Sequence, residues 1–391
     1  MHRRQFLRQT GILSAAACAE ADANAAADPV DIALHEKFFG CIAGLHVGSA
    51  LKGPCEGWRW QDIQAKYGTI DRMIGYQDYH NGWDRLPGTT EDGVERSKMM
   101  STAIIEKKDR VTAEDVRRIW VRDMKPEAAG MISEPFEAVL LAMAKSGMPA
   151  CDIGRYCDYS GLVSMSRSCH PIALINAGDI DGAVEDIFEV GQLYQTTNSR
   201  GLHWAATVGI AIASATKPEA TVDSVLADVL KGHPRFAIGG VGGPRGPARE
   251  IERALELTKT CRDFREMRVA FDAIYNGKGI PYANSYANEV VTKAMCVFRM
   301  CKGNTKEAMI AAVNMGRDTD CLSATASGIS GALTGAGSIP GEWFQQVDYA
   351  TTKMPITNSR RTVKETADGL YDAYQARLRK MRSFIETMEK A

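Results

Sequence analysis

The sequence lacks the features that mark membrane and nucleic-acid-binding proteins. No apolar run approaches the roughly 20 residues that a membrane-spanning helix needs. Basic residues form no block and do not alternate with aromatic residues, and the 47 Lys and Arg nearly balance the 48 Asp and Glu. Nucleic-acid-binding surfaces need such basic clusters. We therefore expect a globular protein without a membrane span and without a nucleic-acid partner.

Cysteine patterns typical of structural metal sites or disulfide scaffolds are also absent. The 10 cysteines include no CxxC pair and no His/Cys ligand spacing, so a structural zinc site is not expected. Cys151 and Cys157, or Cys296 and Cys301, could pair in an oxidising compartment. The preferred interpretation is that most cysteines are buried small hydrophobic residues.

Residues 1–27 resemble an export signal rather than part of a folded domain. Arg3–Arg4 is followed by Phe6–Leu7, a weakly apolar run and Ala-rich steps such as Ala23–Asn24–Ala25. This pattern is similar to a twin-arginine signal peptide, and a chance basic start is the alternative. We predict a periplasmic or secreted protein. The residues before Cys18 form a poor lipoprotein site, so lipid attachment there is not expected.

The rest of the chain predicts a single all-α domain over residues 30–391. Alternating β patterns are scarce, whereas apolar residues recur at helical spacing. The helices predicted are 30–51, 89–105, 112 onward with a capping box, 134–145, 153–177 with a break near Pro171, 181–194, 201–216, 218–231, 249–276, 288–301, 305–313, 320–336, 341–352 and 360–391. Met99, Met100, Met295 and Met300 are expected in the core.

A face of glycines in the first helix predicts a close helix crossing. Gly40, Gly44 and Gly48 are four residues apart and so share one face. The helix after Asp320 is made mostly of serine, alanine and glycine. Glycine costs about 1 kcal/mol against alanine in a helix interior, so we expect this helix to gain by packing against the glycine face. His46, in the same helix, is expected to be packed rather than to bind metal.

Two acidic clusters begin helices, and each has two interpretations. Thr89 and Asp92 have capping-box spacing, and Asp318 followed by Asp320 fits an N-cap beside a helix dipole. Alternatively, the two clusters together form a site for a hard divalent cation, which prefers carboxylate, hydroxyl and water ligands. No compact histidine cluster favours zinc.

Two loops carry weaker signals. Residues 75–87 include Tyr76, Tyr79, His80 and Trp83, which could stack on a sugar or base or pack on the surface. Residues 239–246 are glycine-rich but lack the lysine and hydroxyl residue of a phosphate-binding P-loop. We interpret this second segment as a flexible loop or lid.

Four segments together resemble the ADP-ribosylglycohydrolase family. They are Gly40 to Glu56, Thr90–Glu91–Asp92, Pro171 to Gly178 and Ala311 to Gly335. The resemblance implies an all-α fold with two Mg²⁺ ions, Mn²⁺ being an alternative, between the acidic clusters. It also implies hydrolysis of an N- or O-glycosidic bond at the anomeric carbon of ADP-ribose.

The same resemblance implies roles for individual residues. The metal ligands would be Thr90, Glu91, Asp92, Asp318 and Asp320, and the candidate catalytic residues are Glu56 and Asp92. As a separate hypothesis, we expect Tyr282, Asn284, Gly316 and Arg317 to bind substrate.

Three positions depart from the family pattern. Glu91 and Ser49 stand where the family commonly has Asp, and Cys321 stands where it often has Thr. A thiol is a poor Mg²⁺ ligand. Because an exported enzyme would not meet intracellular ADP-ribosylated proteins, nucleosides and other glycosides are further candidate substrates. A non-catalytic ligand-binding module that keeps the fold is the alternative function.

Overall fold

The computed structural model describes residues 29–76, 85–125, 135–157, 159–237, 246–276, 285–354 and 356–390. Within these ranges the chain consists of helices, turns and two isolated β-bridges, so the all-α prediction is confirmed. The longer helices are α2 (Pro29–Leu51), α3 (Trp60–Tyr67), α4 (Asp92–Lys107), α5 (Ala113–Asp123), α6 (Pro135–Lys145), α9 (Ile180–Gly191), α10 (Arg200–Ala215), α11 (Val222–Lys231), α12 (Gly246–Leu257), α13 (Phe264–Asp272), α14 (Ala287–Met300), α15 (Thr305–Val313), α16 (Thr319–Thr334), α17 (Gly341–Lys353) and α18 (Val363–Glu389). The short ones are η2 (Gly53–Cys55), α7 (Ala150–Ile153), η3 (Gly154–Tyr156), α8 (His170–Ile175) and η4 (Pro234–Ala237).

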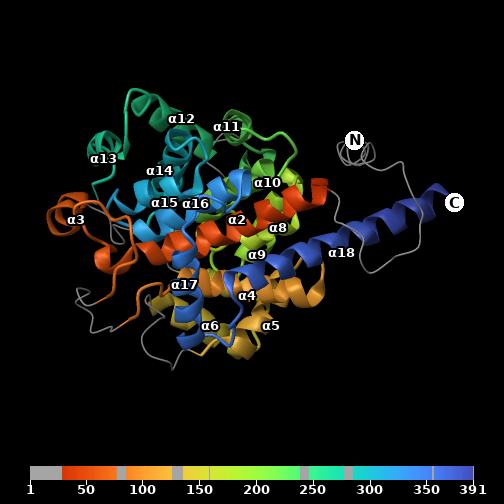
Figure 1. Cartoon of the computed structure of the whole chain (residues 1–391). Coiled ribbons are helices and arrows are strands. Elements are labelled where there is room, and N and C mark those ends of the chain that lie inside the picture. Colours follow the sequence, from red (N-terminus) through yellow and green to blue (C-terminus); the bar gives the residue numbers. More distant parts are fainter. Residues whose placement is uncertain are drawn as a thin grey trace.

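Helices α2 and α16 form the centre of the molecule. They make the most extensive helix–helix contact among the described residues, and Figure 1 shows the other helices arranged around them. Helices α10, α14 and α15 pack on α16, while α18, α15 and α17 pack on α2. Nearly all residues of α16 are buried. No helix in the described ranges is long and apolar enough to cross a membrane.

The predicted glycine face makes the α2–α16 crossing possible. A Cβ atom added at Gly44 would lie 2.2 Å from the carbonyl oxygen of Ser327. One added at Gly40 would lie 2.3 Å from the carbonyl oxygen of Gly331. The Ser327 hydroxyl donates a 2.8 Å hydrogen bond to the Gly44 carbonyl across the contact. The small residues of both helices therefore let the two backbones touch, as predicted.

Local capping signals set several helix starts. The Thr112 side chain accepts from the Asp115 amide, and the Asp115 carboxylate accepts in return from the Thr112 amide, which confirms the predicted capping box of α5. Thr362 and Glu365 form the same arrangement at the start of α18. These reciprocal bonds satisfy amides that the first helical turn leaves without partners.

The predicted helix over residues 153–177 is wrong. The chain instead makes the short elements α7 and η3, then a series of turns, and only then α8. Pro171 lies in the first turn of α8, where its missing N–H costs nothing, so it starts a helix rather than interrupting one. The turns before it carry Arg167 and pair Leu162 with Tyr286 in an isolated bridge.

Two further helix predictions need correction. The span 249–276 is two helices, α12 and α13, because Asp263 accepts hydrogen bonds from the amides of Arg265 and Glu266 and starts a new helix. Helix α3 was not predicted from the sequence. By contrast, the expected core positions Met99, Met100 and Met295 are fully buried, and Met300 is partly buried.

Several predictions fall outside the described residues. These are the residue 1–27 leader with Cys18, the residues Tyr79, His80 and Trp83, the loop 239–245, and the substrate-binding candidates Tyr282 and Asn284. Most of the described cysteines are buried, as expected.

Candidate active site

A buried group of carboxylates lies where α2 ends and α16 begins. Asp318 is the N-cap of α16, and its Oδ1 accepts a 3.3 Å hydrogen bond from the Cys321 amide. Asp320 lies in the first turn of the same helix and is 3% exposed. The capping interpretation is thus confirmed for Asp318. A capping residue still has a second carboxylate oxygen, so capping leaves room for another role.

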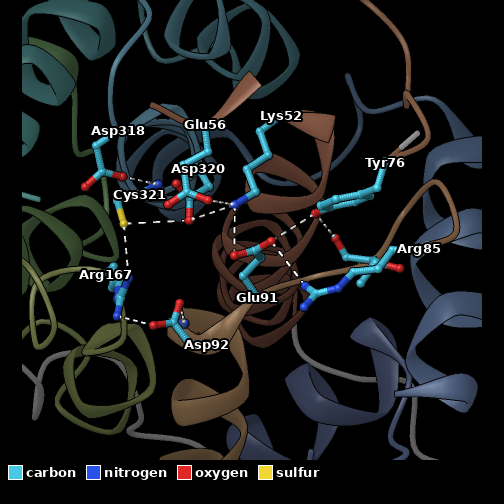
Figure 2. Close-up of polar contacts among 12 residues, drawn as sticks. Lys52, Glu56, Tyr76, Arg85, Glu91, Asp92, Arg167, Asp318, Asp320 and Cys321 are labelled. Carbon is cyan, nitrogen blue, oxygen red and sulfur yellow. Dashed lines mark hydrogen bonds and ion pairs between the residues drawn. The ribbon is translucent and has the colours of Figure 1, made fainter. Parts of the chain in front are cut away.

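Lys52 lies at the centre of this group. It follows α2 directly, and its side chain is 0% exposed. Figure 2 shows its ammonium pointing among the carboxylates of Glu56, Glu91 and Asp320. Lys52 Nζ is 2.6 Å from Glu56 Oε2, 3.0 Å from Glu91 Oε2 and 3.4 Å from Asp320 Oδ2. A lysine is rarely buried so completely unless it is paired, and here three acids from separate segments surround it.

Glu91 faces this lysine instead of capping its own helix. It is the N-cap residue of α4, but its side chain makes no capping hydrogen bond. Its Oε1 accepts from the Tyr76 hydroxyl at 3.2 Å and from Arg85 at 3.3 Å. The capping-box interpretation of Thr89 and Asp92 is therefore wrong. Tyr76 is 1% exposed, so it packs inside the site wall and not on the protein surface.

Asp92 faces a different cation. Its Oδ2 accepts a hydrogen bond from the Arg167 guanidinium, and its Oδ1 accepts from the Gly93 amide at 2.8 Å. The other terminal nitrogen of Arg167 is 3.7 Å from Cys321 Sγ. Figure 2 shows Asp92 directed toward Arg167, beside the carboxylates around Lys52. Both members of this ion pair are nearly buried.

Thr90 belongs to an adjoining polar network. Its hydroxyl donates to Glu95 Oε1 at 3.3 Å, and the same oxygen accepts from Lys98 Nζ at 2.6 Å. The Thr357 hydroxyl donates to Glu95 Oε2 at 2.7 Å. The structure therefore directs the Thr90 hydroxyl to Glu95.

The carboxylates of the cluster differ in the direction in which their pKa is shifted. Burial and the negative charge of Asp320 raise the pKa of Asp318 well above its usual range. Burial also favours the neutral form of Asp320, but Lys52 and Arg167 outweigh it and lower the pKa of Asp320. Burial and Asp320 raise the pKa of Glu56 to about 8, although Lys52 opposes this shift. The Glu56 side chain is 27% exposed, so it is the member of the Lys52 group that solvent reaches.

The donor set fits a hard divalent cation on the α16 side of the cluster. Two buried oxygens there, Asp318 Oδ2 and Asp320 Oδ1, have no hydrogen-bond partner in the part of the chain that the structure describes. Buried carboxylate oxygens without partners are costly, and a Mg²⁺ or Mn²⁺ ion would supply what they lack. Cys321 lies within ligand spacing of both acids. However, burial raises the pKa of the Cys321 thiol well above its ordinary value, and sulfur is a soft ligand.

Gly316 and Arg317 form the turn that leads into Asp318. Both have a positive φ, 75° and 68°. A Cβ at Gly316 would lie 2.5 Å from the Trp60 amide nitrogen, so the turn touches the segment after Glu56. The Arg317 amide donates to the Trp58 carbonyl, and its guanidinium binds Glu289 at 2.6 and 2.8 Å. In the structure, this turn ties the Glu56 segment to the start of α16.

Sequence reasoning missed Lys52 and Arg167. Lys52 had a signal, because it lies four residues after Gly48 and four before Glu56, on the face already singled out. Arg167 had none, since it lies in the turns that were predicted as helix.

Comparison with known proteins agrees with this architecture. The family model described as ADP-ribosylglycohydrolase matches residues 31–379. The chain is 23% identical over 346 residues to the uncharacterized protein YegU of Escherichia coli (strain K12). The matched region covers 84% of this chain and 99% of that protein. A solved structure described as an ADP-ribosylglycohydrolase-related protein complex matches with a TM-score of 0.60, 16% identity and coverage of 88% of this chain and 99% of that chain, which supports the fold. The chain belongs to the ADP-ribosylglycohydrolase family.

Proposed function

We propose that this protein is a divalent-metal-dependent hydrolase that cleaves an N- or O-glycosidic bond at the anomeric carbon of an ADP-ribosyl, nucleoside or related glycoside substrate. Family membership supports a glycohydrolase-type function. The observation that carries the metal dependence is the pair of buried carboxylate oxygens, Asp318 Oδ2 and Asp320 Oδ1, that have no hydrogen-bond partner among the described residues.

Asp318 and Asp320 would hold the metal ion. When bound, the ion supplies positive charge that orients sugar hydroxyls and lowers the pKa of a bound water. One oxygen of Asp318 already accepts a hydrogen bond from the Cys321 amide, so the start of α16 fixes the position of its second oxygen. Such preorganisation is what a metal ligand requires.

Glu56 is the better placed of the two candidate acid–base residues. Glycoside hydrolysis develops positive charge on the sugar ring and needs a group that takes a proton from water or gives one to the leaving group. A group with a pKa near the working pH does this best, and the pKa of Glu56 is raised to about 8. Its side chain is also partly exposed, so substrate can reach it.

Asp92 supports the site in a different way. Its carboxylate pairs with the Arg167 guanidinium and is nearly buried, so substrate and water reach it less easily than they reach Glu56. Because Arg167 also lies 3.7 Å from Cys321, the Asp92–Arg167 pair links the start of α4 to the start of α16. We assign Asp92 a positioning role.

The test is a hydrolysis screen on ADP-ribosyl-arginine, ADP-ribosyl-serine, nucleosides and simple glycosides. Activity should disappear with EDTA and return with Mg²⁺ or Mn²⁺. Glu56→Gln should lower kcat while leaving metal binding intact. Asp62→Asn is the matched control, since Asp62 pairs with Arg59 on the exposed surface. Activity that survives complete metal removal would contradict the metal role. Substrate binding without turnover would instead favour a ligand-binding module.

The proposed location rests on the Arg3–Arg4 leader motif. Replacing both arginines by lysine should retain the protein in the cytoplasm of a host with a twin-arginine export system. Unchanged export of the lysine variant would exclude that route.

A further inference from the structure

The ammonium of Lys52 occupies a place among acids that would otherwise suit a metal ion. Oxygens of Glu56, Glu91 and Asp320 lie within 4.8 Å of one another, which is ligand spacing for a cation. Lys52 Nζ already lies 2.6, 3.0 and 3.4 Å from these three side chains. The group that the acids surround is thus a cation that belongs to the chain.

A metal ion and this ammonium cannot share the same oxygens. Mg²⁺ binds oxygen at about 2.0–2.1 Å and demands near-octahedral geometry, which needs space on all sides of the ion. An ion held by Glu56 Oε2 and Glu91 Oε2 would fall within the space that Nζ fills, and its charge would repel the ammonium. The Lys52 side chain is 0% exposed, so in this structure its ammonium is held among the three acids and not in solvent.

On the α16 side of the cluster, by contrast, two carboxylate oxygens are not paired with Lys52. The Asp320 oxygen that faces Lys52 is Oδ2, and its other oxygen, Oδ1, has no partner. Asp318 Oδ2 is also buried, with no hydrogen-bond partner in the described ranges, and the ion pairs of Lys52 are with Glu56, Glu91 and Asp320. An oxygen of Asp318 and an oxygen of Asp320 lie within 4.8 Å of each other, which is ligand spacing for one ion, and the oxygen of Asp320 that pairs with Lys52 is Oδ2.

We propose that Lys52 is a built-in cation that takes the place of one of two metal ions, so that the protein binds a single divalent ion, at Asp318 and Asp320. This inference rests on the proposed metal dependence and makes it more specific. Unlike a metal, the ammonium has no open coordination position for a sugar hydroxyl or water. The single ion would therefore make all metal contacts to the substrate, while Lys52 holds Glu56 and Glu91 in place.

The test is the number of Mn²⁺ ions bound by the full chain, measured by calorimetry and by electron paramagnetic resonance. We expect one ion with the spectrum of an isolated Mn²⁺. Lys52→Met should bind two ions and give the spectrum of a coupled pair, whereas Lys52→Arg, which keeps the charge, should still bind one. Two ions in the unaltered protein, or one ion in a folded Lys52→Met, would overturn the inference.

Two isosteric variants keep the proposal testable if Lys52→Met does not fold. Asp318→Asn should weaken Mn²⁺ binding by at least about tenfold, by analogy with losses at metal sites. Glu91→Gln should leave both the affinity and the count of one ion unchanged, because Lys52 separates Glu91 from the ion. An equal loss in the two variants would refute the assignment. No Mn²⁺ binding at all would refute the metal dependence itself, whereas two bound ions would refute only the role of Lys52.

Discussion

Gly44→Ala should destabilise the protein although alanine is the better helix former. Gly44 lies where α2 crosses α16, and a Cβ there would meet Ser327 O at 2.2 Å, Ser327 C at 2.4 Å and Gly328 N at 2.7 Å. All three are backbone atoms of a buried helix, so no side chain can rotate away. The two helices would have to move apart.

The expected loss follows from two opposing contributions. Overpacking a buried contact costs typically about 1–3 kcal/mol, and a clash with backbone belongs at the upper end. In the opposite direction, alanine stabilises a helix interior by about 1 kcal/mol relative to glycine. We therefore expect a net loss of about 2 kcal/mol. With an unfolding entropy of about 2.1 cal/mol/K per residue, a domain of about 360 residues would show a fall in Tm of about 2–3 °C. Separating α2 from α16 also moves Lys52 relative to Asp320, so Mn²⁺ affinity should fall too.

The assay is thermal unfolding followed by circular dichroism, together with Mn²⁺ titration. Gly341→Ala is the matched control, because Gly341 starts α17 and a Cβ there would meet no heavy atom within 4 Å. The control should melt like the unaltered protein or slightly above it. If Gly44→Ala also keeps its Tm and its Mn²⁺ affinity, the close-packing argument is refuted.

Three further predictions concern buried titratable side chains. Asp318→Asn should raise the Tm of the metal-free protein near pH 7 and remove the rise in Tm that Mn²⁺ causes, because the raised pKa of Asp318 means that its ionised form is disfavoured in the fold. His170→Gln should flatten the acid dependence of stability: burial lowers the pKa of His170 to about 4, so its contribution is present above about pH 6.5 and is lost as the pH falls toward 4, about 3 kcal/mol in all. Arg167→Met should cost about 3–5 kcal/mol in denaturant unfolding, because it removes the guanidinium from buried Asp92.

Each of these has a control or a contrary outcome. An unaltered response of Tm to Mn²⁺ in Asp318→Asn would place the ion elsewhere. Equal slopes of stability against pH in His170→Gln and the parent would show that this histidine does not titrate with unfolding. For Arg167, the control is Arg59→Met in the exposed pair with Asp62, where about 0–1 kcal/mol is expected; equal costs at the two positions would contradict the argument.

Local signals in the sequence predicted the parts of the fold that local forces decide. Thr112 and Asp115 form their capping box because both partners lie within one helical turn. Gly40 and Gly44 share a face because helical spacing puts them there, and only a small-residue partner could meet that face. The helix predicted over 153–177 failed for the opposite reason. Its local pattern allowed a helix, but contacts with distant segments, such as the Leu162–Tyr286 bridge, hold turns there.

The candidate site divides in the same way. The acids at Glu91, Asp92, Asp318 and Asp320 were identified from their positions at predicted helix starts and from the family resemblance. The sequence did not predict which cation each acid faces: Glu91 pairs with Lys52, and Asp92 pairs with Arg167. The pattern of residues along one helix does not specify the direction of a side chain toward another helix.

The sequence by itself thus determined an all-α chain, a close crossing of two small-residue helices and two acidic helix starts, because each depends on spacing within a segment. Only the tertiary structure decided that Lys52 fills the space between Glu56, Glu91 and Asp320, while one oxygen each of Asp318 and Asp320 has no hydrogen-bond partner among the residues described. That arrangement depends on how closely α2 and α16 approach, and the energies of buried charges depend on distances of a few ångströms between distant residues.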